Sequence, residues 1–105
     1  MSKQKDTKKR AETNGKWIEG SVQDFLQLSD ADMEFIEMRL AASRYLKSIR
    51  QAHKMTQKVA AERLRTSQSR LAKMEAGDAS VSLDLLFKSL FSLGVSRKSL
   101  VRALC

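Results

Sequence analysis

The chain has 105 residues, enough for one domain, and 20 Lys and Arg against 12 Asp and Glu give a formal net charge of +8. Proline is absent and glycine occurs four times, which disfavours a turn-dense β-sandwich or a collagen-like chain. There is no run of about 18 apolar residues that would predict a membrane span, and the lone Cys105 and His53 can form neither a zinc finger nor an internal disulfide. No positioned nucleophile and base can be recognised, so we expect no enzymatic activity, metal or cofactor.

The first 28 residues divide into two segments of different composition. Residues 1–16 are polar and Lys-rich, so we expect a disordered basic tail that either touches phosphates or only keeps the chain in solution. Residues 17–28 are acidic and apolar and include Trp17 and Phe25. Their apolar surface must be covered either by the protein's own helices or by a partner or second subunit. The absence of an apolar signal core at the N-terminus predicts a cytoplasmic protein.

Residues 29–105 are expected to form the folded domain, with five helices at about 30–53, 57–64, 68–76, 83–93 and 97–103. Each predicted helix follows a hydroxyl residue suited to the N-cap, with an apolar residue just before it and another four residues after it in most cases. These N-caps are Ser29, Thr56, Ser67, Ser82 and Ser96. Two glycines, Gly77 and Gly94, stand where a left-handed residue would end a helix.

Apolar side chains recur at helical spacing in the first and fourth predicted helices. The first helix has a stripe formed by Ala42, Tyr45, Leu46, Ile49 and Ala52. In the fourth helix, one face contains Leu83, Leu86, Leu90 and Leu93, flanked by Phe87 and Phe91. The two phenylalanines are either additional core residues or part of a dimer seam.

The second and third predicted helices are separated by only three or four residues, which forces a steep crossing. A small residue is needed at the contact, and Ala60 or Ala61 supplies it. Leu64, Leu71 and Met74, together with Val59 or Ala60, are then expected to point inward. The outward side chains of the third helix are Gln68, Ser69, Ala72 and Lys73, with Arg70 beside them. Between Arg39 and Lys73 there are ten basic residues and one acidic residue, which suits a polyanionic partner.

Residues 56–77, TQKVAAERLRTSQSRLAKMEAG, resemble the helix-turn-helix of the phage-repressor (Cro/Xre-like) group. The resemblance extends over about 29–104 and implies an all-α, five-helix DNA-binding domain. With VQDFLQL upstream and SLDLLFKSLFSLGVSRKSL downstream, the wider pattern resembles the HigA-type antitoxin branch, whose single-domain regulators are often paired with a RelE-like toxin. The family usually has glycine in the turn where this chain has Arg65, so this residue is expected to need a positive φ.

The resemblance also implies roles for individual residues. Gln57 would bind a backbone phosphate and brace Gln68, Gln68 would read an adenine, and Lys73 would reach a guanine or a phosphate. These roles agree with the general preference of glutamine for adenine and of lysine and arginine for guanine in the major groove. Ser69 would touch a base edge or phosphate, and Arg70 a phosphate. The complete set of expected DNA contacts is Thr56, Gln57, Ser67, Gln68, Ser69, Arg70 and Lys73, with phosphate or non-specific contacts from Arg50, Lys54, Lys58 and Arg65.

The sequence therefore predicts a regulator that binds double-stranded DNA, a repressor acting as a homodimer on a palindromic operator with half-sites about 34–36 Å apart. The same molecule could be the antitoxin of a toxin–antitoxin pair. The alternative is a protein-interaction module whose main role is to neutralise a RelE-like toxin, with DNA binding secondary. Candidate dimer or partner contacts are Trp17, Phe25, Phe87 and Phe91. Membrane-surface binding would use the same positive charge, but caps and turns that specify a globule disfavour it.

Overall fold

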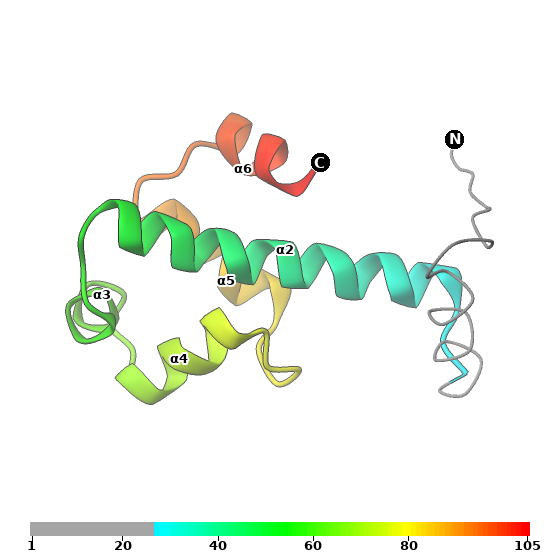
Figure 1. The fold of residues 1–105 in the computed structure, drawn as a ribbon, viewed down its shortest axis with the longest axis horizontal. Helices are drawn as coiled ribbons and strands as arrows, with labels where there is room; N and C mark the ends of the chain where they lie inside the picture. Colours follow the sequence, from blue (N-terminus) through cyan, green and yellow to red (C-terminus); the bar gives the residue numbers. More distant parts are fainter. Residues whose placement is uncertain (1–26) are drawn as a thin grey trace. The chain divides into compact units, whose positions relative to one another are not determined.

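The computed structural model describes residues 27–105, and these residues contain five α-helices (Figure 1). They are α2 (Asp30–Ala52), α3 (Gln57–Arg63), α4 (Gln68–Ala76), α5 (Leu83–Ser92) and α6 (Arg97–Leu104). The all-α, five-helix fold expected from the sequence is thereby confirmed, with helix ends that differ by one residue at most. The expected basic tail, Trp17 and Phe25 lie outside the described residues.

All five hydroxyl N-caps predicted from the sequence are present. Ser29 forms a reciprocal pair in which its Oγ accepts from the backbone N–H of Asp32 at 3.1 Å and its own N–H donates to Oδ2 of Asp32 at 3.2 Å. At each of the other four starts, the hydroxyl accepts from the backbone N–H three residues later, also at 3.1 Å; these caps are Thr56, Ser67, Ser82 and Ser96. Each cap satisfies an N–H that the helix itself cannot bond.

Four of the helices end in the same backbone motif, with a left-handed residue directly after the last turn. Gly77 and Gly94 occupy this position after α4 and α5, as predicted, with φ of 77° and 93°. Lys54 and Arg65 occupy it after α2 and α3, with φ of 57° and 58°. In each case the N–H one residue further on donates back to a carbonyl five residues earlier, which is the pattern of the Schellman motif. The positive φ expected at Arg65 is confirmed, whereas the one at Lys54 was missed.

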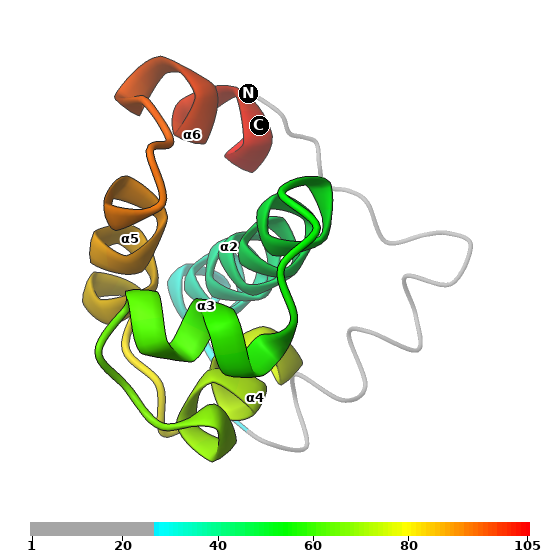
Figure 2. The same ribbon diagram turned by 90° about the vertical axis from the view of Figure 1, so that its left-hand side faces the viewer.

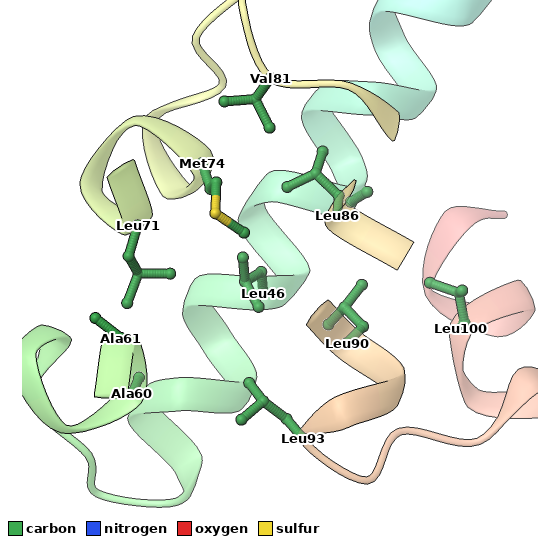
Figure 3. Close-up of a cluster of buried hydrophobic side chains, with 11 residues drawn as sticks. Leu46, Ala60, Ala61, Leu71, Met74, Val81, Leu86, Leu90, Leu93 and Leu100 are labelled. Carbon is green, nitrogen blue, oxygen red and sulfur yellow. The ribbon is translucent and has the colours of Figure 1, made fainter. Parts of the chain in front are cut away.

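Within the compact unit formed by residues 36–105, α2 runs between α4 on one side and α6 on the other (Figures 1 and 2). Leu46 of α2 is fully buried and faces Leu71 and Met74 of α4 and Leu86 and Leu90 of α5 (Figure 3). The buried cluster thus links α4 to α2 and α5, and it leaves the opposite face of α4 outside the core.

Two expectations about the core are refined by the observed burial. Ala60 and Ala61 are both buried, at 1% and 2% exposed, whereas Val59 is 45% exposed, so the inward position belongs to Ala60. Ala52, expected at the end of the apolar stripe of α2, is exposed. α2 ends at that residue.

Gly77→Ala is expected to destabilise the domain more than Gly94→Ala. Both substitutions place an L side chain at a positive φ, which costs about 1–2 kcal/mol. At Gly77 an added Cβ would also lie 2.6 Å from Cδ2 of Leu40, whereas nothing lies within 4 Å at Gly94. Urea denaturation of both variants measures the difference, which we expect to be on the order of 1 kcal/mol. In a Leu40→Ala background the difference should disappear, and its persistence there would rule out the steric explanation.

Candidate nucleic-acid interface

α3 and α4 are joined by only four residues, Leu64 to Ser67. The turn is closed by three backbone hydrogen bonds, in which Leu64, Arg65 and Thr66 donate to carbonyls of α3 at 2.9, 3.1 and 2.9 Å. The buried Ala60 and Ala61 allow the two helices to pack closely. The short turn therefore holds the start of α4 next to the end of α3 (Figure 2).

The two faces of α4 have opposite character. Leu71, Met74 and Glu75 are buried on the inner face. The outer side chains are exposed and polar or cationic: Gln68, Ser69, Arg70 and Lys73. No hydrogen bond within the described chain draws the terminal groups of Gln68 or Lys73 inward. Four of the residues expected to contact DNA from α4 are thus brought together on one accessible surface, which we call the α4 face.

Thr56 and Ser67 were expected to contact DNA and are also the N-caps of α3 and α4. Their oxygens accept from Val59 N–H and Arg70 N–H. A hydroxyl that accepts one hydrogen bond keeps its own O–H as a donor. Ser67 and Ser69 also lie 3.3 Å apart between their Oγ atoms. Both caps can therefore donate to a phosphate oxygen without giving up the cap.

The side-chain amide of Gln57 has a different partner from the one expected. Its Nε2 donates to Oε1 of Glu75 at 3.2 Å, and the residue is partly buried. The expected brace between Gln57 and Gln68 is therefore replaced by a bond to a carboxylate, which is a stronger acceptor than an amide. The amide group has a second N–H, so a phosphate contact from Gln57 remains compatible with this arrangement.

Arg50 was expected to contact phosphate, and the structure gives its guanidinium a structural role instead. Nε and Nη2 donate to the two carboxylate oxygens of Glu75 at 2.6 and 3.0 Å, and Nη1 donates to the carbonyl of Met55 at 2.9 Å. The side chains of Arg50 and Glu75 are only 12% and 3% exposed. The hydrogen bond that Arg50 donates to Glu75 raises the pKa of Arg50 above its usual value, and the pair joins α2 to α4.

The other three residues expected to make phosphate or non-specific contacts remain exposed. Lys54 and Lys58 flank the start of α3, and Arg65 lies in the turn before α4. Of the two phenylalanines in α5, Phe87 packs partly buried against the core, whereas Phe91 is 42% exposed. Phe87 therefore contributes to the core, and Phe91 is the more exposed of the two.

The loop after α4 carries a carboxylate, that of Asp78, whose pKa is lowered by hydrogen bonds within the loop. Oδ1 of Asp78 accepts from the backbone N–H of Ser80 at 2.8 Å and from its hydroxyl at 2.6 Å. These bonds, aided by the charges of Lys73 and Arg39, lower the pKa of Asp78. Because the folded-state pKa is lowered, the stabilisation is present above the ordinary aspartate pKa and is lost as the pH falls through the lowered value.

A comparison with protein-family models matches residues 46–100, more than half of the chain, to the family described as helix-turn-helix (HTH_3). The chain belongs to this helix-turn-helix family. The matched region contains α3, α4 and α5 with their connecting turns, and it makes the protein a DNA-binding transcriptional regulator of the Xre/Cro type. Searches of curated proteins and of solved structures gave no match.

Residues 27–105 were also compared with the requirements of a membrane-crossing helix and of a metal site. None of their helices combines the length and apolar character needed to cross a membrane. No group of three or more His, Cys, Asp and Glu side chains in the same range is arranged to hold a metal ion.

Replacing Arg65 with glycine is expected to stabilise the helix-turn-helix by about 0.5–1 kcal/mol, because glycine adopts a positive φ without the steric cost that arginine bears there. The same substitution at Arg63, inside the last turn of α3, is the matched control and should destabilise by about 1 kcal/mol. Thermal and urea unfolding of the two variants test the opposite signs. A loss of stability in Arg65→Gly would show that the arginine side chain contributes more than its backbone strain costs.

Proposed function

We propose that this helix-turn-helix protein is a repressor that binds a palindromic operator as a homodimer, with α4 of each subunit in the major groove. The α4 face carries the proposal. Its polar side chains are exposed on a helix whose opposite face is anchored in the core. One subunit offers few base contacts, whereas a twofold dimer presents two copies of α4 to half-sites about one helical turn apart, ~34–36 Å.

Within this proposal each residue of the α4 face contacts the part of the DNA that suits the chemistry of its side chain. Gln68, at the start of α4, carries an amide that can both donate and accept, as required for the N6 and N7 positions of adenine. Lys73 lies five residues further along and can donate to guanine O6 or N7. Ser69 and Arg70 are assigned to a base edge or phosphate and to phosphate, respectively.

The phosphate contacts come from residues around α4. Thr56 and Ser67 supply hydroxyl donors from the two N-caps, and Gln57 supplies its second amide hydrogen. Lys54, Lys58 and Arg65 supply exposed cations. Such contacts fix the orientation of the protein on the duplex, and the bases are then read by side chains of α4.

Gln68→Ala and Lys73→Ala are each expected to weaken operator binding by about 1–3 kcal/mol, or roughly 5–150-fold, and to relax base preference at one position per half-site. The operator is first obtained by selecting bound duplexes from a random pool, and affinities are then measured by fluorescence anisotropy. Lys98→Ala, which removes an exposed lysine from α6, is the matched control and should bind like the wild type. If Gln68→Ala bound every operator variant as tightly as the wild type, the assignment of base contacts would be wrong.

A second role, binding of a RelE-like toxin, is supported by apolar side chains exposed outside the α4 face. Phe91 of α5 is 42% exposed and Val101 of α6 is 60% exposed, and α6 lies across α2 from α4 (Figure 1). A protein partner could cover them while α4 stays free. The test is co-expression with a RelE-like protein encoded beside this chain, followed by size-exclusion chromatography. A stable complex that Phe91→Asp disrupts supports the antitoxin role, and separate elution of the two wild-type proteins contradicts it.

A further inference from the structure

The C-terminal end of α4 is held by α2 through contacts that the α4 face does not use. Nη1 of Arg39 donates to the carbonyl oxygens of both Gly77 and Asp78, each at 3.1 Å. Beside it, the side chain of Leu40 fills the space that a Cβ on Gly77 would need. Two neighbouring residues of α2 therefore contact the first residues after α4, nearly forty positions away in sequence.

We propose that Arg39 is a positioning residue for DNA reading: it clamps the end of α4 and sets the angle at which Gln68 meets a base. This proposal rests on the proposed function of the α4 face and adds a residue to it that touches no DNA. A guanidinium is suited to the role, because one terminal nitrogen has two hydrogens and can bond two carbonyls at once. Its charge also complements the negative end of the helix dipole.

Arg39 adds a second directional contact to the C-terminal end of α4, beyond the ion pair of Glu75. Glu75 is the anchoring polar group on the inner face, and it bonds Arg50 and Gln57. Leu71 and Met74 contribute apolar packing, which is non-directional. Gln68 lies about 13 Å along the helix axis from Gly77, so a tilt of roughly 5° there would move it by about 1 Å. Side chains that read bases must be held to about 0.5 Å.

The test compares Arg39→Ala with Arg44→Ala, which removes the same charge from an exposed site on α2. For each variant, the dissociation constants for the selected operator and for a scrambled duplex are measured at one salt concentration. We expect Arg39→Ala to weaken operator binding by about 5–20-fold while scrambled-duplex binding changes less than about 2-fold. Arg44→Ala should change both affinities equally. Arg39→Lys, which keeps a charged N–H donor, should recover most of the lost preference.

A readout without DNA separates the clamp from the proposed function. In the free protein, Arg39→Ala is expected to shift the ¹⁵N resonances of Asp78 and Ala79, whose peptide bonds contain the two carbonyls. Residual dipolar couplings should report a changed tilt of α4 relative to α2. If the wild type shows no operator preference but the tilt changes, the proposed function fails and the clamp stands. An unchanged tilt, or equal loss of both DNA affinities in Arg39→Ala, overturns the positioning role.

Discussion

Glu75→Ala is expected to lower the free energy of unfolding by about 3–5 kcal/mol, because it leaves the buried guanidinium of Arg50 without its counter-charge. Arg50 is 12% exposed and directs three of its nitrogens at protein acceptors, two of which are the carboxylate oxygens of Glu75. The substitution also removes the acceptor of Gln57. Domains of this size are commonly stable by only about 5–15 kcal/mol, so the variant should be close to unfolding at physiological temperature.

The surface pair of Lys88 and Asp84 is a matched control for this prediction. Their charged atoms are 3.3 Å apart, but both side chains are about three-quarters exposed, so Lys88→Ala should cost no more than about 0.5 kcal/mol. Urea denaturation monitored by circular dichroism measures both variants. The double substitution Arg50→Met with Glu75→Leu should recover much of the loss, since it removes both buried charges together. A Glu75→Ala cost as small as that of Lys88→Ala would contradict a buried ion pair in solution.

Operator affinity is expected to fall by about four orders of magnitude between 50 and 200 mM salt. Four cations of each subunit are exposed and are expected to neutralise one phosphate each: Lys54, Lys58, Arg65 and Arg70. A dimer then neutralises about eight phosphates, and a plot of the logarithm of affinity against the logarithm of salt concentration should have a slope of about −7. Fluorescence anisotropy titrations across this range give the slope directly. The value reports the number of phosphate contacts and does not depend on which bases are read.

Two arginine variants locate these contacts. Arg70→Ala should make the slope shallower by about two per dimer, because it removes one phosphate contact from each subunit. Arg102→Ala removes the same charge from α6, across α2 from α4, and should leave the slope unchanged. Gln68→Ala should lower specificity at an unchanged slope. The opposite pattern, with the slope sensitive to Arg102 and insensitive to Arg70, would place the duplex on another face of the protein.

The features that the sequence predicted well depend on residues close together in the chain. A hydroxyl N-cap such as Ser67 bonds an N–H three residues away, and the left-handed Gly77 lets the next residue, Asp78, bond a carbonyl five residues back. The alternation of buried and exposed side chains along α4 follows from helical periodicity alone. The α4 face was therefore visible in the sequence, because Leu71 and Met74 mark the buried side, and Gln68, Ser69 and Lys73 lie away from it.

The features that were missed depend on contacts between distant residues. Arg50 reads as an exposed cation in the basic C-terminal half of the first helix, and only the fold brings Glu75, 25 positions later, within 2.6 Å of it. Gln57 is drawn to the same carboxylate, and Arg39 bonds carbonyls that any residue could supply. Lys54 is a related case, since its positive φ follows from the path of the chain into α3 and no glycine marks it. Nothing in the sequence marked Glu75, a glutamate in the last turn of α4, as the partner of a buried arginine.

The anchoring of α4 on its buried side has a consequence for the partner. A reading helix that is fixed before contact loses little conformational entropy on docking, but it also adapts little to an imperfect groove. In the proposed complex, the adjustment falls on the duplex, whose bendability differs from one base step to the next. Base pairs between the two half-sites, which no side chain would touch, should then influence affinity through their stiffness.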